Sequence, residues 1–258
     1  METSVNLGEN IGNDLVILTD ESGRKSPPQI FPIDDFNPTA IAPGKVTCIV
    51  AKRGSGKSTL IRNLLYQLRK APLCLAFSAT EQYNNFYGDI IDESMIHEDY
   101  DSDIIKTLIQ RQKIIINKTL ASNPFETHAV LVLDDTIADA NKIFNDRQMK
   151  FLFFNGRALK INLIIAAQCI MSIPPNYRVN IDYVFLFKET NLTVQKKLYE
   201  FFGASIFPRF EDFKASMDHY TTDYGCMVIN NTSVDADYRK RVFKYKARVD
   251  LPDFKMSK

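Results

Sequence analysis

Tryptophan is absent from this chain of 258 residues, and histidine and cysteine are scarce, with three and four copies. The cysteines lie far apart and none forms a CxxC pair, which argues against a metal site or a disulfide framework. We expect buried thiols at Cys48, Cys74 and Cys226 within apolar runs, and at Cys169 just after one. His97 and His128 have no metal-ligand spacing, and we expect both at the surface.

The chain also lacks a long apolar run and a recognisable leader. No apolar stretch approaches the roughly 18–20 residues that a membrane-spanning helix needs. Residues 1–13 show no basic segment followed by an apolar one, which is the pattern of a secretory signal. We therefore expect an intracellular protein with no membrane-spanning segment.

An excess of charge of either sign is missing as well. Thirty-two basic and 31 acidic side chains give a net charge of +1, which argues against a wholly basic nucleic-acid binder and against a disordered polyanion. The charges are nevertheless segregated. Residues 89–103 hold seven acids and no Lys or Arg, whereas residues 239–248 hold six bases and no acid.

What the chain does contain is a series of short apolar runs that alternate with helical patterns. The runs lack the alternation of a half-exposed strand, which is typical of strands buried in a parallel sheet. They are residues 46–51, 73–77, 129–133, 163–167 and 183–187. One face of a helix is traced by Leu60, Ile61, Leu64, Leu65 and Leu68. The order predicts a three-layer α/β fold with a mostly parallel central sheet, and residues 225–229 and 241–245 predict a C-terminal hairpin added to it.

The strongest motif is Ala51-Lys-Arg-Gly-Ser-Gly-Lys-Ser58, between the first predicted strand and the helix. It follows the P-loop pattern, with Ala51 where the first glycine usually stands. Gly54 and Gly56 would let successive backbone N–H groups form a nest for phosphate at the helix N-terminus. Lys57 would reach the β- and γ-phosphates of ATP, and Ser58 would ligate Mg²⁺. The predicted nucleotide-binding residues are Arg53, Gly54, Ser55, Gly56, Lys57, Ser58 and Thr59.

A second motif supplies the acids that such a site needs. The run Val130-Leu-Val-Leu ends in Asp134-Asp135, the pattern of a Walker B strand. We expect Asp134 to hold the Mg²⁺ shell, and Asp135 to polarise the attacking water where many ATP hydrolases carry Glu. Asp is one methylene shorter than Glu, which keeps a nucleotide-binding switch without turnover open as an alternative.

A polar residue after another strand indicates the class of P-loop protein. Residues 163–167 end at Gln168, which could hydrogen-bond the γ-phosphate or the lytic water. In ATP hydrolases of the RecA type (the ASCE class) such a strand is inserted between the P-loop strand and the Walker B strand. Nucleotide kinases, the other alternative, usually lack that insertion and carry an Arg-rich lid, which we do not see.

Together these motifs and Asn155-Gly-Arg157 resemble the FtsK–HerA superfamily, and most of all the poxvirus-type genome-packaging ATPases of large DNA viruses. The resemblance covers roughly residues 42–190. It implies an ATP-driven motor that assembles as a pentameric or hexameric ring and moves double-stranded viral DNA into the capsid. It also implies capsid or portal-vertex proteins as partners, and the host cytoplasm (the virus factory) and the virion as the places of action.

A ring gives Arg157 a predicted role as a catalytic residue. An arginine from the neighbouring subunit can neutralise the charge that develops on the γ-phosphoryl oxygens. Arg147 and Arg178 are competing candidates for this arginine, and a helix-terminal structural role is the alternative for Arg157. Around a pore, several copies of a small basic patch would supply charge density without a basic chain.

We divide the chain into an N-terminal extension (residues 1–42), a P-loop ATPase core (43–190) and a C-terminal helix and hairpin appendage (191–258). For DNA contact, the basic segment 239–248 and the loop 171–177 are both candidates. For segment 239–248, a basic strand face that lies over the sheet without binding DNA is an equally favoured alternative. The acidic stretch 89–103 is expected to be a solvated helix–loop region.

Overall fold

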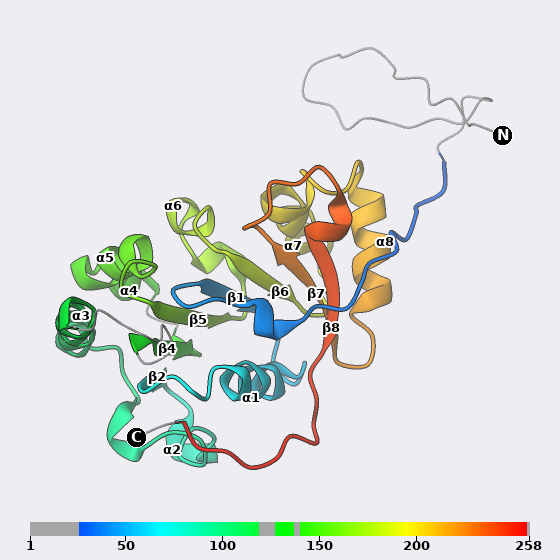
Figure 1. Cartoon of the computed structure of the whole chain (residues 1–258). Coiled ribbons are helices and arrows are strands. Elements are labelled where there is room, and N and C mark those ends of the chain that lie inside the picture. The colour runs from blue at the N-terminus through cyan, green and yellow to red at the C-terminus, as the bar shows by residue number, and fades with distance from the viewer. Residues whose placement is uncertain (1–25, 119–126, 137–139, 257–258) are drawn as a thin grey trace.

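The computed structural model describes residues 26–118, 127–136 and 140–256. A short apolar run in the predicted N-terminal extension, residues 15–18, for which an edge strand is expected, lies outside them. Within the described residues an eight-stranded sheet runs in the order β3-β2-β4-β5-β1-β6-β7-β8 (Figure 1). The strands are β1 (Val46–Val50), β2 (Cys74–Ser78), β3 (Ile96–His97), β4 (Ala129–Asp134), β5 (Ile161–Ala167), β6 (Tyr183–Leu186), β7 (Gly225–Asn230) and β8 (Val242–Lys246). The α-helices are α1 (Lys57–Gln67), α2 (Glu81–Asn84), α3 (Ser102–Lys118), α4 (Ala140–Asn145), α5 (Arg147–Asn155), α6 (Pro175–Arg178), α7 (Leu192–Leu198) and α8 (Phe210–Tyr220).

The sheet confirms the predicted topology. Strands β1 to β6 pair in parallel, whereas β7 runs antiparallel to β6 and β8 antiparallel to β7, which is the predicted C-terminal hairpin. Strand β5 lies between β1 and β4 and pairs with both. The strand that ends at Gln168 is therefore the inserted strand that the sequence predicted.

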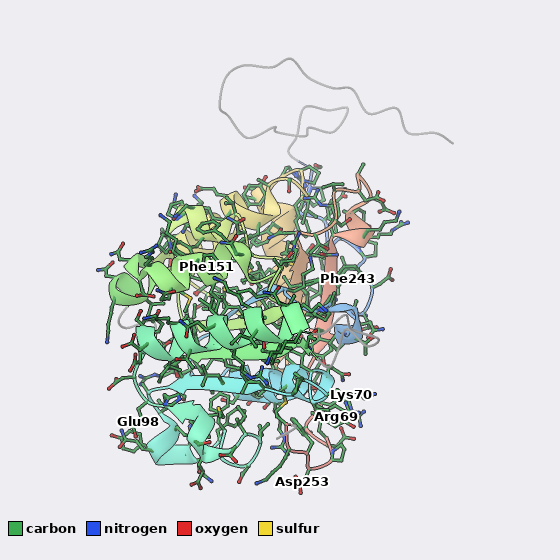
Figure 2. All side chains as sticks on the ribbon, turned by 60° about the vertical axis from the view of Figure 1, so that its left-hand side comes forward. Arg69, Lys70, Glu98, Phe151, Phe243 and Asp253 are labelled. Carbon is green, nitrogen blue, oxygen red and sulfur yellow. The ribbon has the colours of Figure 1, made fainter. Side chains whose placement is uncertain are left out.

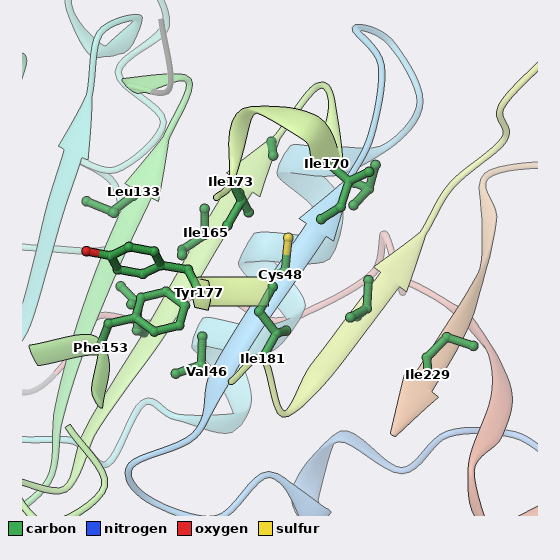
Figure 3. Close-up of a cluster of buried hydrophobic side chains, with 14 of the residues drawn as sticks. Val46, Cys48, Leu133, Phe153, Ile165, Ile170, Ile173, Tyr177, Ile181 and Ile229 are labelled. Carbon is green, nitrogen blue, oxygen red and sulfur yellow. The ribbon is translucent and has the colours of Figure 1, made fainter. Parts of the chain in front are cut away.

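Two apolar clusters cover the two faces of the sheet. Along β1, Val46, Cys48 and Val50 face the cluster that contains α3, α5 and α8, whereas Ile49 faces the cluster that contains α1. Figure 3 shows the first face, where Phe153 and Tyr177 lie over the central strands. Because both faces are covered, the strands need apolar residues at every position, and this explains their continuous apolar runs.

The buried positions confirm most of the predicted core. The predicted helix face is buried along α1 and just after it: Leu60, Ile61, Leu64, Leu65 and Leu68. Cys48, Cys74 and Cys226 are buried as expected, and burial raises the pKa of the Cys48 thiol to about 12. Such thiols remain protonated and serve as small apolar side chains.

The expectation of a surface position for His128 is wrong. His128 is 1% exposed, and its Nε2 lies 2.9 Å from Asn162 Oδ1. It directly precedes β4, which is flanked by β2 and β5, so the sheet and its helices cover the ring. Burial lowers the pKa of His128, and this favours a neutral imidazole.

Segments from both ends of the chain pack along the domain. Residues 26–41 run beside β8, where Phe36 N donates to Lys244 O at 2.8 Å (Figure 1). After β8 the chain crosses α1, where the Asn63 side chain bonds the backbone N–H and C=O of Arg248, and Met256 N then donates to Ile90 O. Figure 2 marks this C-terminal segment by Asp253. Since β7 and β8 continue the same sheet, the division into three parts at residues 42 and 190 stays a prediction.

Gly44, in the turn before β1, is placed by a close contact between backbones. Its φ is +81°, and a Cβ at this position would lie 2.7 Å from Arg157 Cα. Its N–H donates to the buried Asn162 Oδ1 at 2.6 Å. The turn that leads into the P-loop strand therefore requires a glycine.

We predict that Gly44→Ala lowers the free energy of unfolding by about 3 kcal/mol, because left-handed backbone strain adds to the overlap with Arg157. Gly54→Ala is the matched control. Gly54 has a similar φ of +73° but open space around its Cβ, so about 1 kcal/mol is expected. Urea unfolding followed by circular dichroism measures both values, and equal losses would contradict the role of the Arg157 contact.

Candidate nucleotide site

The P-loop lies at the edge of the sheet where the parallel strands β1, β4 and β5 end. Gly54 and Gly56 adopt φ values of +73° and +98°, and α1 begins directly after Gly56. The first turn of a helix leaves backbone N–H groups without intrahelical acceptors, and these face an incoming anion. A cavity of about 540 Å³ opens here. Its lining includes six of the seven predicted nucleotide-binding residues: Arg53, Gly54, Gly56, Lys57, Ser58 and Thr59.

Four predicted side chains from three different elements meet in this cavity. Lys57 Nζ lies 2.8 Å from Asp134 Oδ1 and 2.7 Å from Asp135 Oδ1. Gln168 Nε2 donates to Asp135 Oδ1 at 3.3 Å. Ser55, the seventh predicted P-loop residue, bonds Lys52 O through its hydroxyl at 2.6 Å and so stabilises the loop itself.

Asp135 has an unusual backbone conformation. Its φ is +53°, in the left-handed region that Asp tolerates better than most residues with a Cβ. Neighbouring residues of a strand point to opposite faces of the sheet. The left-handed turn at Asp135 changes this, so that the carboxylates of Asp134 and Asp135 both pair with the Lys57 ammonium group. Both acids are therefore available to one bound group.

The sequence reasoning missed Tyr87. This side chain is 0% exposed, and its hydroxyl donates to Asp134 Oδ2 at 3.0 Å. Glu81 fixes the segment by accepting the backbone N–H groups of Tyr87 and Gly88 at 2.8 to 3.0 Å. Burial and the neighbouring Asp134 carboxylate raise the pKa of Tyr87 well above its ordinary value, so the hydroxyl stays a donor. No local motif marks Tyr87, because its partner lies 47 residues away.

Glu189 was missed for the same reason. It follows β6, has a side chain that is 8% exposed, and pairs with Lys52 of the P-loop at 2.5 Å. The same carboxylate accepts Asn191 N at 2.6 Å, while Gln195 of α7 bonds the Glu189 carbonyl. Glu189, which lies 137 residues after Lys52, thus connects the P-loop to α7.

The chemistry of these side chains fits Mg²⁺ bound together with a triphosphate. Among the described residues, no group of three or more His, Cys, Asp or Glu side chains is arranged to hold a metal ion. Mg²⁺ at P-loop sites needs no such cage, since it is held by one hydroxyl, one carboxylate, water and phosphate. Ser58 and Asp134 line the same cavity and would be the protein's contribution.

Arg157 lies at the opposite edge of the sheet, before β5 begins. Its guanidinium pairs with Asp182 at 2.9 Å, and its side chain remains 70% exposed. It therefore does not contribute to the nucleotide site of its own chain. Of the competing arginines, Arg147 is exposed at the start of α5, whereas Arg178 lies over the Phe201 ring at 3.8 Å.

The basic segment 239–248 is more neutralised than its sequence suggests. Four of its six basic side chains pair with exposed carboxylates: Lys240 with Asp235, Lys244 with Asp35, Lys246 with Asp223 and Arg248 with Asp250. Arg241 bonds the hydroxyl and carbonyl of Ser205, which do not compensate its charge. The acidic stretch 89–103 is partly structural, because Tyr100 and Ser102 bond Asp146 at 2.7 Å and Asp92 caps a short helical turn.

The described residues include no helix that is long and apolar enough to span a membrane.

The inserted strand β5, the P-loop and the paired acids together define a P-loop ATPase of the RecA and FtsK type. Residues 43–198 match the poxvirus A32 protein family, and the chain belongs to that family. This confirms the resemblance to the poxvirus-type packaging ATPases that the motifs indicated. The chain is 40% identical to protein 075L of Invertebrate iridescent virus 6 over 86% of this chain and 84% of that one. It is 29% identical to protein L437 of Acanthamoeba polyphaga mimivirus over 83% of this chain and 76% of that one.

Solved structures share the fold. The DNA-packaging ATPase B204 of Sulfolobus turreted icosahedral virus superposes with a TM-score of 0.56 at 15% identity, over 81% of this chain and all of that one. The genome-packaging NTPase B204 of Sulfolobus turreted icosahedral virus 2, in complex with ATP-γ-S, superposes with a TM-score of 0.53 at 15% identity. This superposition covers 82% of this chain and 98% of that one.

We predict that Tyr87→Phe raises the Mg²⁺ concentration for half-maximal ATPase activity by roughly tenfold, because a hydrogen bond that orients a metal-side carboxylate is lost. The control is Tyr177→Phe, which removes another buried hydroxyl, bonded to Phe144 O at 2.6 Å and remote from the cavity. Each variant is expected to lose about 1–2 kcal/mol of stability. Equal Mg²⁺ dependence in the two variants would contradict a positioning role for Tyr87.

Proposed function

We propose that this ATPase is the motor that translocates double-stranded viral genomic DNA into the capsid. Family membership together with the Lys57, Asp134, Asp135 and Gln168 cluster supports the proposal. We further propose that it acts as a pentameric or hexameric ring, with capsid or portal-vertex proteins as partners. The host cytoplasm, at the virus factory, and the virion are the proposed places of action.

In this proposal each side chain of the cluster has one task. Lys57 leaves Asp134 and Asp135 and neutralises the β- and γ-phosphate oxygens, and its departure frees both carboxylates. Asp134 and Ser58 would hold Mg²⁺, and the ion would supply positive charge against the phosphates. Asp135 accepts a proton from the attacking water, and Gln168, already within 3.3 Å of Asp135, orients that water.

Arg157 completes the site from the neighbouring subunit. Its side chain projects 70% exposed at the edge of the sheet away from its own P-loop, and only a second subunit can bring it to a nucleotide. The ion pair with Asp182 holds the Arg157 guanidinium of this subunit close to the start of its β1, since Asp182 also accepts Val46 N at 2.9 Å. A movement at the nucleotide can reach the strand next to the P-loop through this contact.

Contact with DNA would use few residues per subunit. With four of the six bases of segment 239–248 already paired with carboxylates, the positive charge that remains on the segment per subunit is small. Repetition around a ring multiplies this charge, and exposed ion pairs exchange readily for phosphate because each is worth little. Weak, sequence-independent contacts suit a motor that must release DNA at every step.

The alternatives differ in their requirements. A nucleotide kinase needs an acceptor pocket, and the strand inserted between β1 and β4 is not its usual arrangement. A nucleotide-binding switch needs no water-activating acid, and the shorter Asp135 is the feature that favours it. Measurements of ATP turnover distinguish the kinase and the switch from the motor.

The central test is ATPase activity with and without long duplex DNA. We expect stimulation by DNA, and a loss of turnover of about 100- to 1,000-fold in Lys57→Ala, because a phosphate-neutralising charge is removed. Lys142→Ala, an exposed lysine of α4, is the matched control and should retain activity. Turnover that requires a nucleoside acceptor would favour a kinase instead, and nucleotide binding without turnover would favour a switch.

The trans role of Arg157 is tested by mixing two inactive variants. Arg157→Ala is expected to reduce turnover roughly 1,000-fold, as for other arginines that act in trans, while its loss of an exposed ion pair costs at most about 1 kcal/mol of stability. A 1:1 mixture with Lys57→Ala should regain activity at about a quarter of the interfaces, where an intact P-loop meets an intact Arg157.

The same mixtures with Arg147→Ala and Arg178→Ala test the competing arginines. The Arg157→Ala mixture could stay inactive while the mixture with Arg147→Ala or Arg178→Ala regains activity. In that case the arginine replaced in the active mixture is the one that acts in trans. A strictly monomeric protein in the presence of ATP and DNA would contradict the ring altogether.

A further inference from the structure

One exposed aromatic side chain in the nucleotide cavity has no part in the chemistry described above. Tyr224 lines the cavity, is 63% exposed, and stands in the turn that joins α8 to β7 (Figure 1). We propose that the Tyr224 ring stacks on the base of the bound nucleotide. This inference rests on the proposed function, and it identifies the residue that binds the nucleoside end.

The position of Tyr224 relative to the acids carries the argument. Across the sheet the acids follow β4, Gln168 follows β5, the P-loop follows β1, and Tyr224 precedes β7 on the far side of β6. The γ-phosphate is expected on the β4 side of the P-loop, because the proposed chemistry brings it to Lys57, Asp134 and Asp135. The nucleoside must then extend toward the other side of the P-loop, where Tyr224 lies.

Tyr224 also lies against the phosphate loop itself. A Cβ on Gly56 would meet Tyr224 Cδ1 at 3.4 Å and Phe187 Cε1 at 3.5 Å. Phe187 is 3% exposed, whereas Tyr224 is 63% exposed and leaves much of its surface to solvent. An open aromatic face next to the phosphate loop is what a stacked base requires, because every base has a π-face.

The backbone holds this side chain in place despite strain. Asp223 and Tyr224 have φ values of +48° and +59°, which are unfavourable for residues with a Cβ. The turn is fixed by the hydrogen bond from Gly225 N to Thr222 O at 2.9 Å and by the close packing of Gly225, whose Cβ would lie 2.5 Å from Tyr220 O. Because the Tyr224 ring is exposed, its burial does not offset the cost of the strained backbone. Strain of this kind is concentrated at ligand sites.

Phe86, the other aromatic ring in the cavity that could stack, is less suitable. It belongs to the segment after α2, on the acid side of the P-loop, and packs edge-on against Tyr87 with ring centroids 4.8 Å apart. A base there would compete with the γ-phosphate end of the cavity. We therefore assign the base to Tyr224.

The test compares ADP with inorganic pyrophosphate, which shares its phosphates but has no base, in calorimetric titrations with Mg²⁺. Tyr224→Ala is expected to weaken ADP binding roughly tenfold and to leave pyrophosphate binding unchanged, because one base–aromatic stack is removed. Tyr224→Phe keeps the ring and should bind ADP like the wild type. Equal ADP affinity of Tyr224→Ala and the wild type would overturn the inference, as would a parallel loss of pyrophosphate binding.

A second variant exploits the absence of tryptophan from the chain. Tyr224→Trp introduces a single indole, whose fluorescence should be quenched by ADP and unaffected by pyrophosphate. Phe154→Trp, at an exposed position of α5, is the control and should respond to neither. No response of Tyr224→Trp to saturating ADP would overturn the stacking. A wild-type chain that binds neither ADP nor pyrophosphate overturns the proposed function itself, and the two failures are thereby distinguished.

Discussion

One ammonium group between two carboxylates determines how the P-loop edge of the sheet is arranged. Lys57 is contributed by α1, and Asp134 and Asp135 by the end of β4, so the contact spans three positions of the sheet, with β5 lying between. The Lys57 side chain is only 12% exposed and that of Asp134 only 6%. A charge this far from water is stable only when it is paired and hydrogen-bonded, so the three groups hold one another in place.

Other buried contacts serve that arrangement. Tyr87 supplies a second hydrogen bond to Asp134 from a segment that Glu81 shapes, and Glu189 joins the P-loop lysine Lys52 to α7. At the opposite edge, Asp182 accepts Val46 N and pairs with Lys45 and Arg157. The P-loop strand β1 is therefore fixed by carboxylates at both of its ends, and rigid support of this kind keeps reactive side chains within bonding distance.

Charge in this molecule is local rather than global. A net charge of +1 conceals the acidic and basic segments, and the ion pairs at residues 240–248 reduce the basic one further. Exposed pairs of this kind are weak and are screened by salt, so they can be exchanged for other anions. The net charge of a subunit consequently says little about whether its assembly binds a polyanion.

The sequence by itself determined the three-layer fold, the inserted strand, the helix after the P-loop and the acids at the end of β4. It could do so because these features depend on local patterns: continuous apolar runs, helical periodicity and glycines at fixed offsets. The positions of Tyr87, Glu189 and Tyr224 at the nucleotide cavity and its P-loop, and the burial of His128, depend on contacts between residues far apart in the chain. Only the tertiary structure decided them, because the neighbours of a side chain follow from strand order and turn geometry, which no local pattern specifies.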